Sequence, residues 1–150
     1  MPSTNDLYES FKRRFVNTCH HTAFAKTPYP WQQTNVGGSL IVAYQFANLP
    51  LKLPLLVRPT GGGKTLVFTS AAACIKGITI CITPLLLSLG ANQVQKIMSK
   101  TSETDNSVVG FHLDELTDAK LLELRIYMST LTSNTNKTII LFSSPQLIVS

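Results

Sequence analysis

Arg58-Pro59-Thr60-Gly61-Gly62-Gly63-Lys64-Thr65 is the stretch that decides the fold of this chain. It follows an apolar run over residues 53–57 and precedes a helix-compatible segment over residues 66–76. Strand, glycine-rich turn, Lys-Thr and helix in this order are typical of a phosphate-binding loop. Consecutive glycines let backbone N–H groups approach an anion, and the following helix adds its unpaired N-terminal donors. The stretch therefore predicts a site for a nucleoside triphosphate.

The residues of the loop have distinct expected roles. The backbone from Thr60 to Gly63 would cradle the phosphates, and Lys64 would neutralise charge on the β- and γ-phosphates. The hydroxyl of Thr65 would ligate Mg²⁺. Arg58 departs from the general pattern, which has glycine at that position. The alternative is a glycine-rich turn that only joins a strand to a helix, but the order of the elements favours the phosphate site.

Composition sets the broad class of protein. The 150 residues suggest one domain, and they are 44% apolar and 14% charged, which is typical of a globular chain and not of a disordered one. The net charge of +5 is a hint of a polyanionic partner. The densest basic run is Lys12-Arg13-Arg14, and a solvated helix face explains it equally well.

The cysteines and the apolar segments indicate the kind of cellular compartment in which the protein is expected. None of the spacings among Cys19, Cys74 and Cys81 suits zinc or a redox pair, and the adjacent side chains of Cys19-His20-His21 cannot easily converge on one ion. The N-terminus has no signal-peptide pattern. The most apolar window, residues 78–91, is shorter than the ~20 residues of a membrane span. We therefore expect an intracellular, reduced protein without a membrane segment.

Helix and strand patterns alternate along the second two-thirds of the chain. A first helix is expected over residues 5–18, capped by Asn5 or Thr4, with Leu7, Phe11 and Phe15 on one face. The continuous β-branched run over residues 78–82 predicts a strand buried on both faces. Further strands are expected at 55–57, 108–113 and 138–142, and further helices at 40–47, 66–75, 85–98 and 117–128. This alternation predicts an α/β fold with a parallel sheet, flanking helices and right-handed crossovers.

Several motifs resemble the first motor domain of a superfamily 2 helicase of the RecQ type. Residues 59–65 are similar to that family's phosphate loop, and Tyr29-Pro30-Trp31-Gln32-Gln33 resembles its adenine-reading motif. Downstream, residues 82–94 resemble the family's segment that touches the nucleic acid backbone. Residues 140–147 resemble its strand that ends in Ser-Pro-Glu-x-Leu. The resemblance covers about residues 25–150, so we expect an N-terminal helical extension over 1–24 and a partial ATP-binding domain over 25–150.

The resemblance implies a RecA-like P-loop fold that binds ATP and Mg²⁺ and acts on nucleic acid, DNA rather than RNA, with the nucleus as a location. Gln32 would read adenine. The site residues implied for ATP and Mg²⁺ are Gln32, Thr60, Gly61, Gly62, Gly63, Lys64 and Thr65, and those implied for nucleic acid are Pro84 and Gln93. Two alternatives stay open, because Trp31-Gln32 can be a polar loop against an aromatic core residue and residues 84–94 can be a helix that only packs.

Departures from the family pattern concern the loop and the later motifs. Arg58 is not the usual small residue or Met, and Gln146 stands in place of the family's Glu. The segment after Pro84 has one Leu too many, and the Arg usually seen near the adenine-reading motif is absent.

The acidic motif that hydrolysis needs is missing from these residues. In the family, an Asp-Glu-x-His at the end of a buried strand holds Mg²⁺ and orients the attacking water, and that strand follows the Ser-Pro segment. Here five residues follow Pro145, so we expect a helicase fragment that stops before its catalytic acids, with an incomplete sheet and negligible ATP turnover. Whether the chain is itself an enzyme stays open.

A different assignment of the acids leads to other functions. Residues 108–115 form an apolar run that ends in Asp114-Glu115, and Asp114 can be the Mg²⁺ carboxylate of a small, complete P-loop NTPase or kinase. We prefer a capping role for these acids, at the start of the helix near Thr117. A non-catalytic nucleotide-binding or decoy module is the third hypothesis.

Overall fold

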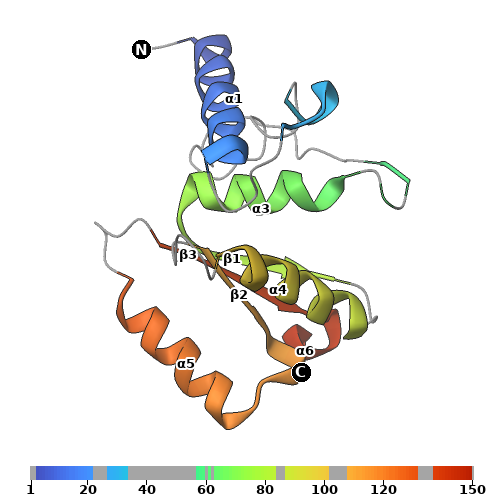
Figure 1. Ribbon diagram of the computed structural model, residues 1–150, viewed down its shortest axis with the longest axis vertical. Coiled ribbons are helices and arrows are strands. Elements are labelled where there is room, and N and C mark those ends of the chain that lie inside the picture. The colour runs from blue at the N-terminus through green and yellow to red at the C-terminus, as the bar shows by residue number, and fades with distance from the viewer. Residues whose placement is uncertain are drawn as a thin grey trace. The chain divides into compact units, whose positions relative to one another are not determined.

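The computed structural model describes residues 3–21, 27–33, 57–59, 61, 63–83, 87–101, 108–131 and 137–149. The chain divides into two compact units, Met1–Ile75 and Lys76–Ser150 (Figure 1). The predicted boundary between residues 24 and 25 falls within the first unit, at residues outside the described ranges. The predicted helix at 40–47 also lies outside them, as does most of the predicted strand at 55–57, whose last residue, Val57, belongs to no strand and is 80% exposed.

The first unit begins with helix α1, Thr4–His21. Its cap is Ser3, and not Asn5 or Thr4 as predicted. The Ser3 hydroxyl accepts a hydrogen bond from the Asp6 N–H at 3.2 Å, and the Asp6 carboxylate accepts from the Ser3 N–H at 3.1 Å. This reciprocal arrangement between residues three positions apart is a capping box, which marks the start of a helix. The helix also runs three residues past its predicted end.

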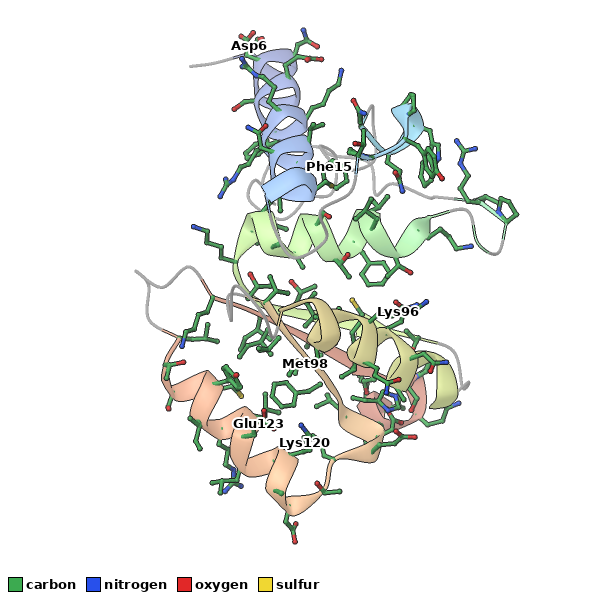
Figure 2. All side chains as sticks on the ribbon, viewed as in Figure 1. Asp6, Phe15, Lys96, Met98, Lys120 and Glu123 are labelled. Atoms are coloured by element: carbon green, nitrogen blue, oxygen red, sulfur yellow. The ribbon has the colours of Figure 1, made fainter. Side chains whose placement is uncertain are left out.

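Helix α3, Lys64–Ile75, completes the described core of the first unit. Phe11, Phe15 and Cys19 repeat every four residues along α1 and pack against Ala71 and Cys74 of α3. Figure 2 labels Phe15, which is fully buried on the side of α1 that faces α3. The predicted apolar face of α1 is therefore confirmed at both phenylalanines, while the side chain of Leu7 lies outside the described residues.

The buried thiols of this core are also hydrogen-bonded. The Cys19 thiol lies 3.3 Å from Ser70 Oγ, and the Cys74 thiol lies 3.0 Å from Thr18 Oγ1. Burial raises the pKa of both thiols, because the thiolate loses its hydration there. Cys19 and Cys74 are thus unreactive core residues.

The second unit is an α/β arrangement around a parallel sheet. Strands β1 (Gly77–Ile82), β2 (Val108–His112) and β3 (Thr138–Ser143) form a three-stranded sheet in the order β1-β3-β2, with all pairs parallel. Helix α4 (Leu87–Thr101) connects β1 to β2, and a short 3₁₀ helix η2 (Leu113–Glu115) and α5 (Asp118–Ser129) connect β2 to β3. The predicted α/β class with a parallel sheet and flanking helices is confirmed.

The pairing of β2 with β3 brings the core side chains of this unit onto one face of the sheet. Val109 pairs with Ile139 and Phe111 with Leu141, so the four side chains lie on one face of the sheet. Leu124 of α5 packs against that face, and the ring of Tyr127 meets Phe111 edge-on with ring centroids 6.0 Å apart. Gly110, between Val109 and Phe111 in β2, lies next to Val94 and Ile97 of α4. Every residue of β3 is buried, as expected for a central strand.

Strand β1 differs from its prediction. We expected it to be buried on both faces, but Ile78, Ile80 and Ile82 are 37%, 59% and 60% exposed. Among the described strands β1 pairs only with β3, so it forms an edge of the sheet. A β-branched run favours an extended backbone whether or not a second layer covers it, which is why the sequence pattern overestimated the burial.

Two further details complete the fold. A short helix α6, Pro145–Val149, follows β3 and was not predicted. None of the described helices has the combination of length and apolar character that crossing a membrane requires.

Candidate functional site

Both glycines of the loop that the structure describes have positive φ angles. Gly61 and Gly63 have φ angles of +77° and +83°, in the left-handed region where glycine alone carries no side-chain penalty. Helix α3 begins directly afterwards at Lys64, so its first N–H groups adjoin the loop. Thr60 and Gly62, which were predicted to share the phosphate cradle, lie outside the described residues.

Lys64 folds back over the loop that precedes it. Its ammonium donates hydrogen bonds to the backbone carbonyls of Arg58 at 2.8 Å and of Pro59 at 3.1 Å. An ammonium carries three donors, so these two bonds leave one for a ligand. The residue is exposed. The predicted phosphate-binding cation is thus held at the start of the loop, close to the backbone that would surround an anion.

Gln32 ties the predicted adenine motif to the loop. Its amide Nε2 donates to the Gly63 carbonyl at 2.7 Å, and its Oε1 accepts from the Tyr29 N–H at 2.6 Å. The side chain is buried, with 1% of its surface exposed. These contacts connect residues 31 apart in the sequence, so the structure brings together two motifs that the sequence shows only in order. Contact between Gln32 and a base stays a prediction.

A second contact between the same two segments was not predicted. The Arg58 guanidinium carbon lies 4.6 Å from the centre of the Trp31 ring, which is a cation–π contact. The sequence signal was the departure at Arg58, which puts a cation where the phosphate-loop pattern has glycine. What the sequence could not show is that the loop and the turn at 30–33 lie close enough for the two side chains to stack.

Thr65, the predicted Mg²⁺ ligand, occupies the first turn of α3. Its carbonyl accepts from the Thr69 hydroxyl at 2.7 Å. Its own hydroxyl has no hydrogen bond to another described residue, and the side chain is half-buried. A hydroxyl beside the N-terminus of a helix that follows a phosphate loop suits a ligand of Mg²⁺. Mg²⁺ coordination itself stays a prediction.

The residues predicted to touch nucleic acid belong to the second unit. Pro84 lies outside the described residues. Gln93 is on α4, where its Oε1 atom is buried and accepts no hydrogen bond from the described part of the chain. A contact between Gln93 and a nucleic acid backbone therefore stays a prediction.

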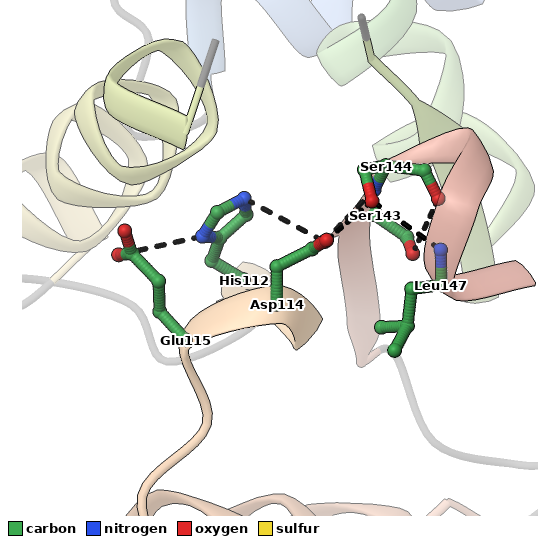
Figure 3. A network of polar contacts seen from close by, with 6 residues as sticks. All are labelled: His112, Asp114, Glu115, Ser143, Ser144 and Leu147. Carbon is green, nitrogen blue, oxygen red and sulfur yellow. Dashed lines mark hydrogen bonds and ion pairs between the residues drawn. The ribbon is translucent and has the colours of Figure 1, made fainter. Parts of the chain in front are cut away.

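Asp114 makes different contacts from those predicted for it (Figure 3). One carboxylate oxygen accepts from the Ser144 N–H at 2.8 Å, and the other accepts from the Ser144 hydroxyl. These hydrogen bonds lower the pKa of the carboxyl group, since they favour its charged form. Asp114 does not cap α5, because Thr117 does so by accepting from the Lys120 N–H. Asp114 instead joins η2 to the end of β3.

His112 extends this network, but the arrangement is not that of an activated nucleophile. Its Nε2 atom lies 3.9 Å from Asp114 Oδ2, and its Nδ1 atom lies 3.4 Å from Glu115 Oε2. Ser144 donates to the carboxylate and not to the imidazole, so the histidine cannot take the serine proton.

No group of three or more described His, Cys, Asp or Glu residues is placed to hold a metal ion.

A cavity of about 410 Å³ adjoins His112 in the second unit. It lies between α4 and β2, and its lining is mainly apolar, including Val94, Met98, Phe111 and Leu116. Of the predicted site residues that the structure describes, none lines it.

Comparison with protein-family models, with curated proteins and with solved structures finds no match to the chain.

Proposed function

We propose that these residues form the ATP-binding part of a RecQ-like helicase motor domain, with a RecA-like P-loop fold. The observation that carries the proposal is the hydrogen bond from Gln32 to the Gly63 carbonyl at 2.7 Å. It links the segment resembling the adenine-reading motif to the phosphate loop, as a site that binds base and phosphates together requires. A glycine-rich turn that only connects two elements would need no such link.

The chemistry of the proposed site is binding and charge neutralisation. Loop N–H groups and the α3 N-terminus surround the phosphates, and Lys64 supplies a positive charge that two loop carbonyls already orient. The Thr65 hydroxyl would hold Mg²⁺, which would supply further positive charge for the phosphates. Gln32, whose amide donates to the Gly63 carbonyl, would read adenine.

The proposal extends to nucleic acid and to turnover in a limited way. The net charge of +5 and the segment that includes Gln93 support DNA as the partner, and a nuclear location follows from the helicase resemblance. The 150 residues contain no Asp-Glu-x-His, and both oxygens of Asp114 already accept hydrogen bonds from Ser144. We therefore propose ATP binding with negligible hydrolysis for these residues.

Calorimetric titration with Mg²⁺-ATP tests the phosphate site. Lys64→Ala removes a charge-assisted contact, so ATP should bind at least about tenfold more weakly. Lys120→Ala is the matched control, because it removes the same charge from α5, where Lys120 pairs with Glu123 at 2.9 Å. The control should bind ATP within about twofold of the wild type. ATP binding that survives Lys64→Ala in a folded variant would remove the basis for a P-loop site.

Phosphate release separates this proposal from a complete NTPase or kinase. We expect negligible turnover by the wild type and by Asp114→Ala alike. Robust turnover that Asp114→Ala abolishes would identify Asp114 as a catalytic carboxylate and would overturn the helicase-fragment proposal.

A further inference from the structure

Arg58 places a second positive charge at the start of the phosphate loop. The Arg58 carbonyl is one of the two that hold Lys64, so Arg58 and the Lys64 ammonium are neighbours. The Arg58 side chain is exposed and lies over the Trp31 ring, 4.6 Å from its centre. The general phosphate-loop pattern has glycine at this position, so it assigns no side-chain role in binding to residue 58.

The contact of the Arg58 guanidinium with the Trp31 ring is weaker than a contact with phosphate oxygens would be. A cation–π contact at an exposed position is weak, since water competes for the cation. Phosphate oxygens offer charge-assisted hydrogen bonds that match the planar, forked donors of arginine. A triphosphate brought to the loop by Lys64 would therefore be the better partner, and an exposed side chain can turn toward it.

We propose that Arg58 exchanges partners when a nucleoside triphosphate binds, leaving the Trp31 ring and donating to phosphate oxygens. This inference rests on the proposed ATP site and adds a residue and a conformational response to it. Because Arg58 adjoins the Lys64 ammonium, which would meet the β- and γ-phosphates, its contribution depends on the number of phosphates. Arg58 thus favours ATP over ADP and AMP, and Trp31 reports the exchange.

A purely structural role for the pair makes a different prediction. If the stack only holds the loop against the turn at 30–33, loss of either side chain should weaken ATP binding. If Arg58 leaves the ring on binding, the ring competes with ATP for the guanidinium. Trp31→Ala should then tighten ATP binding while Arg58→Ala weakens it, so the two substitutions have opposite signs.

Titration of the full chain with Mg²⁺-ATP, Mg²⁺-ADP and AMP tests the exchange. Arg58→Ala should weaken ATP binding about tenfold, and AMP binding hardly at all. Arg58→Lys should fall between, because it keeps the charge and loses the fork. Trp31→Ala should tighten ATP binding about two- to fivefold, which is the range of an exposed cation–π contact. Arg125→Ala, an exposed arginine of α5, is the charge control and should match the wild type.

Tryptophan fluorescence gives a second readout, since Trp31 is the only tryptophan in the chain. ATP should change the emission of the wild type, and Arg58→Ala without ATP should already resemble the ATP-bound wild type. Trp31→Phe keeps an aromatic ring for packing and serves if Trp31→Ala does not fold. It should tighten ATP binding less than Trp31→Ala, because phenylalanine is a weaker cation–π partner.

The outcomes separate this inference from the proposed function. If ATP binds to the wild type, Lys64→Ala weakens it, and Arg58→Ala behaves like Arg125→Ala, the site stands and the exchange is wrong. The exchange is also wrong if Trp31→Ala weakens ATP binding in a folded variant. If the wild type does not bind ATP, or Lys64→Ala has no effect, both the site and the exchange are overturned.

Discussion

The two units of this chain use polar contacts in different ways. In the first unit, hydrogen bonds from distant residues shape a loop, because Gln32 holds the Gly63 carbonyl and Lys64 holds those of Arg58 and Pro59. In the second unit, apolar side chains of paired strands form the core. Both carboxylate oxygens of Asp114 accept hydrogen bonds from Ser144 of the same unit. The first arrangement leaves donors for a ligand, whereas the second satisfies its carboxylate internally.

This difference shows why a motif must be judged by the partners of its residues. Asp114-Glu115 after an apolar strand has the sequence appearance of a metal-holding end, yet its first carboxylate is used to join η2 to β3. The glycine-rich loop departs from its pattern at Arg58, yet its two described glycines have positive φ and its lysine donates to loop carbonyls, and the proposed phosphate site rests on these features. The following substitutions test whether the two units differ in this way.

The largest effect should come from the apolar core of the second unit. Ile139 is 1% exposed in β3, and Ile139→Ala should lower the free energy of unfolding by about 2–5 kcal/mol, through lost burial and a residual cavity. Ile80 is the matched control, because it lies in the adjacent strand β1 and is 59% exposed. Ile80→Ala should cost about 0.5 kcal/mol or less. Urea unfolding measures both, and equal losses would contradict the assigned core.

An intermediate effect should come from the loop glycines of the first unit. Gly63→Ala should lower stability by about 1–3 kcal/mol, because its φ is +83° and the new Cβ would lie 2.7 Å from Gln32 Nε2. Gly61→Ala meets nothing within 4 Å at a φ of +77°, so it should cost only the backbone strain, about 1–2 kcal/mol. Gly63→Ala should also weaken ATP binding more than Gly61→Ala does.

Gly110→Ala is the corresponding glycine substitution in the second unit. A Cβ there would meet Ile97 and Val94 at 3.6 Å, an ordinary packing distance. Gly110→Ala should therefore change stability by no more than about 0.5 kcal/mol in either direction. If thermal unfolding shows Gly110→Ala to be as harmful as Gly63→Ala, the distinction between a ligand loop and a packed strand fails.

The smallest effect should be the pH dependence of the Asp114 network. Because Ser144 lowers the pKa of Asp114, this carboxylate stabilises the fold above its unfolded pKa of about 3.9, and the stabilisation disappears as pH falls through the lower folded pKa. Asp114→Asn should therefore melt below the wild type near pH 6 and converge with it in acid. Glu123→Gln removes a half-buried carboxylate on α5 that pairs only with Lys120 among the described residues, and it should follow the wild type near pH 6 more closely. Parallel melting curves for Asp114→Asn and the wild type at every pH would show that the network contributes nothing.

Much of the fold followed from local pattern. The strands at 78–82, 108–113 and 138–142 and the helices at 66–75 and 117–128 were predicted within a few residues, because β-branched runs and capped apolar segments act locally. The positive φ angles at Gly61 and Gly63 were also implied by residue type. The exposed side of β1 and the partner of Asp114 were missed because they depend on neighbouring elements. The Ser3 cap was missed although its capping box with Asp6 is a local pattern.

The sequence by itself determined that a glycine-rich loop precedes a helix and that apolar strands and helices alternate after it, because φ preference and hydrophobic period are properties of short segments. Only the tertiary structure decided that Gln32 reaches Gly63, that Arg58 stacks on Trp31 and that Asp114 bonds to Ser144. Each of these contacts joins residues about 30 positions apart. Their distances depend on how whole elements pack, and no local preference specifies that packing.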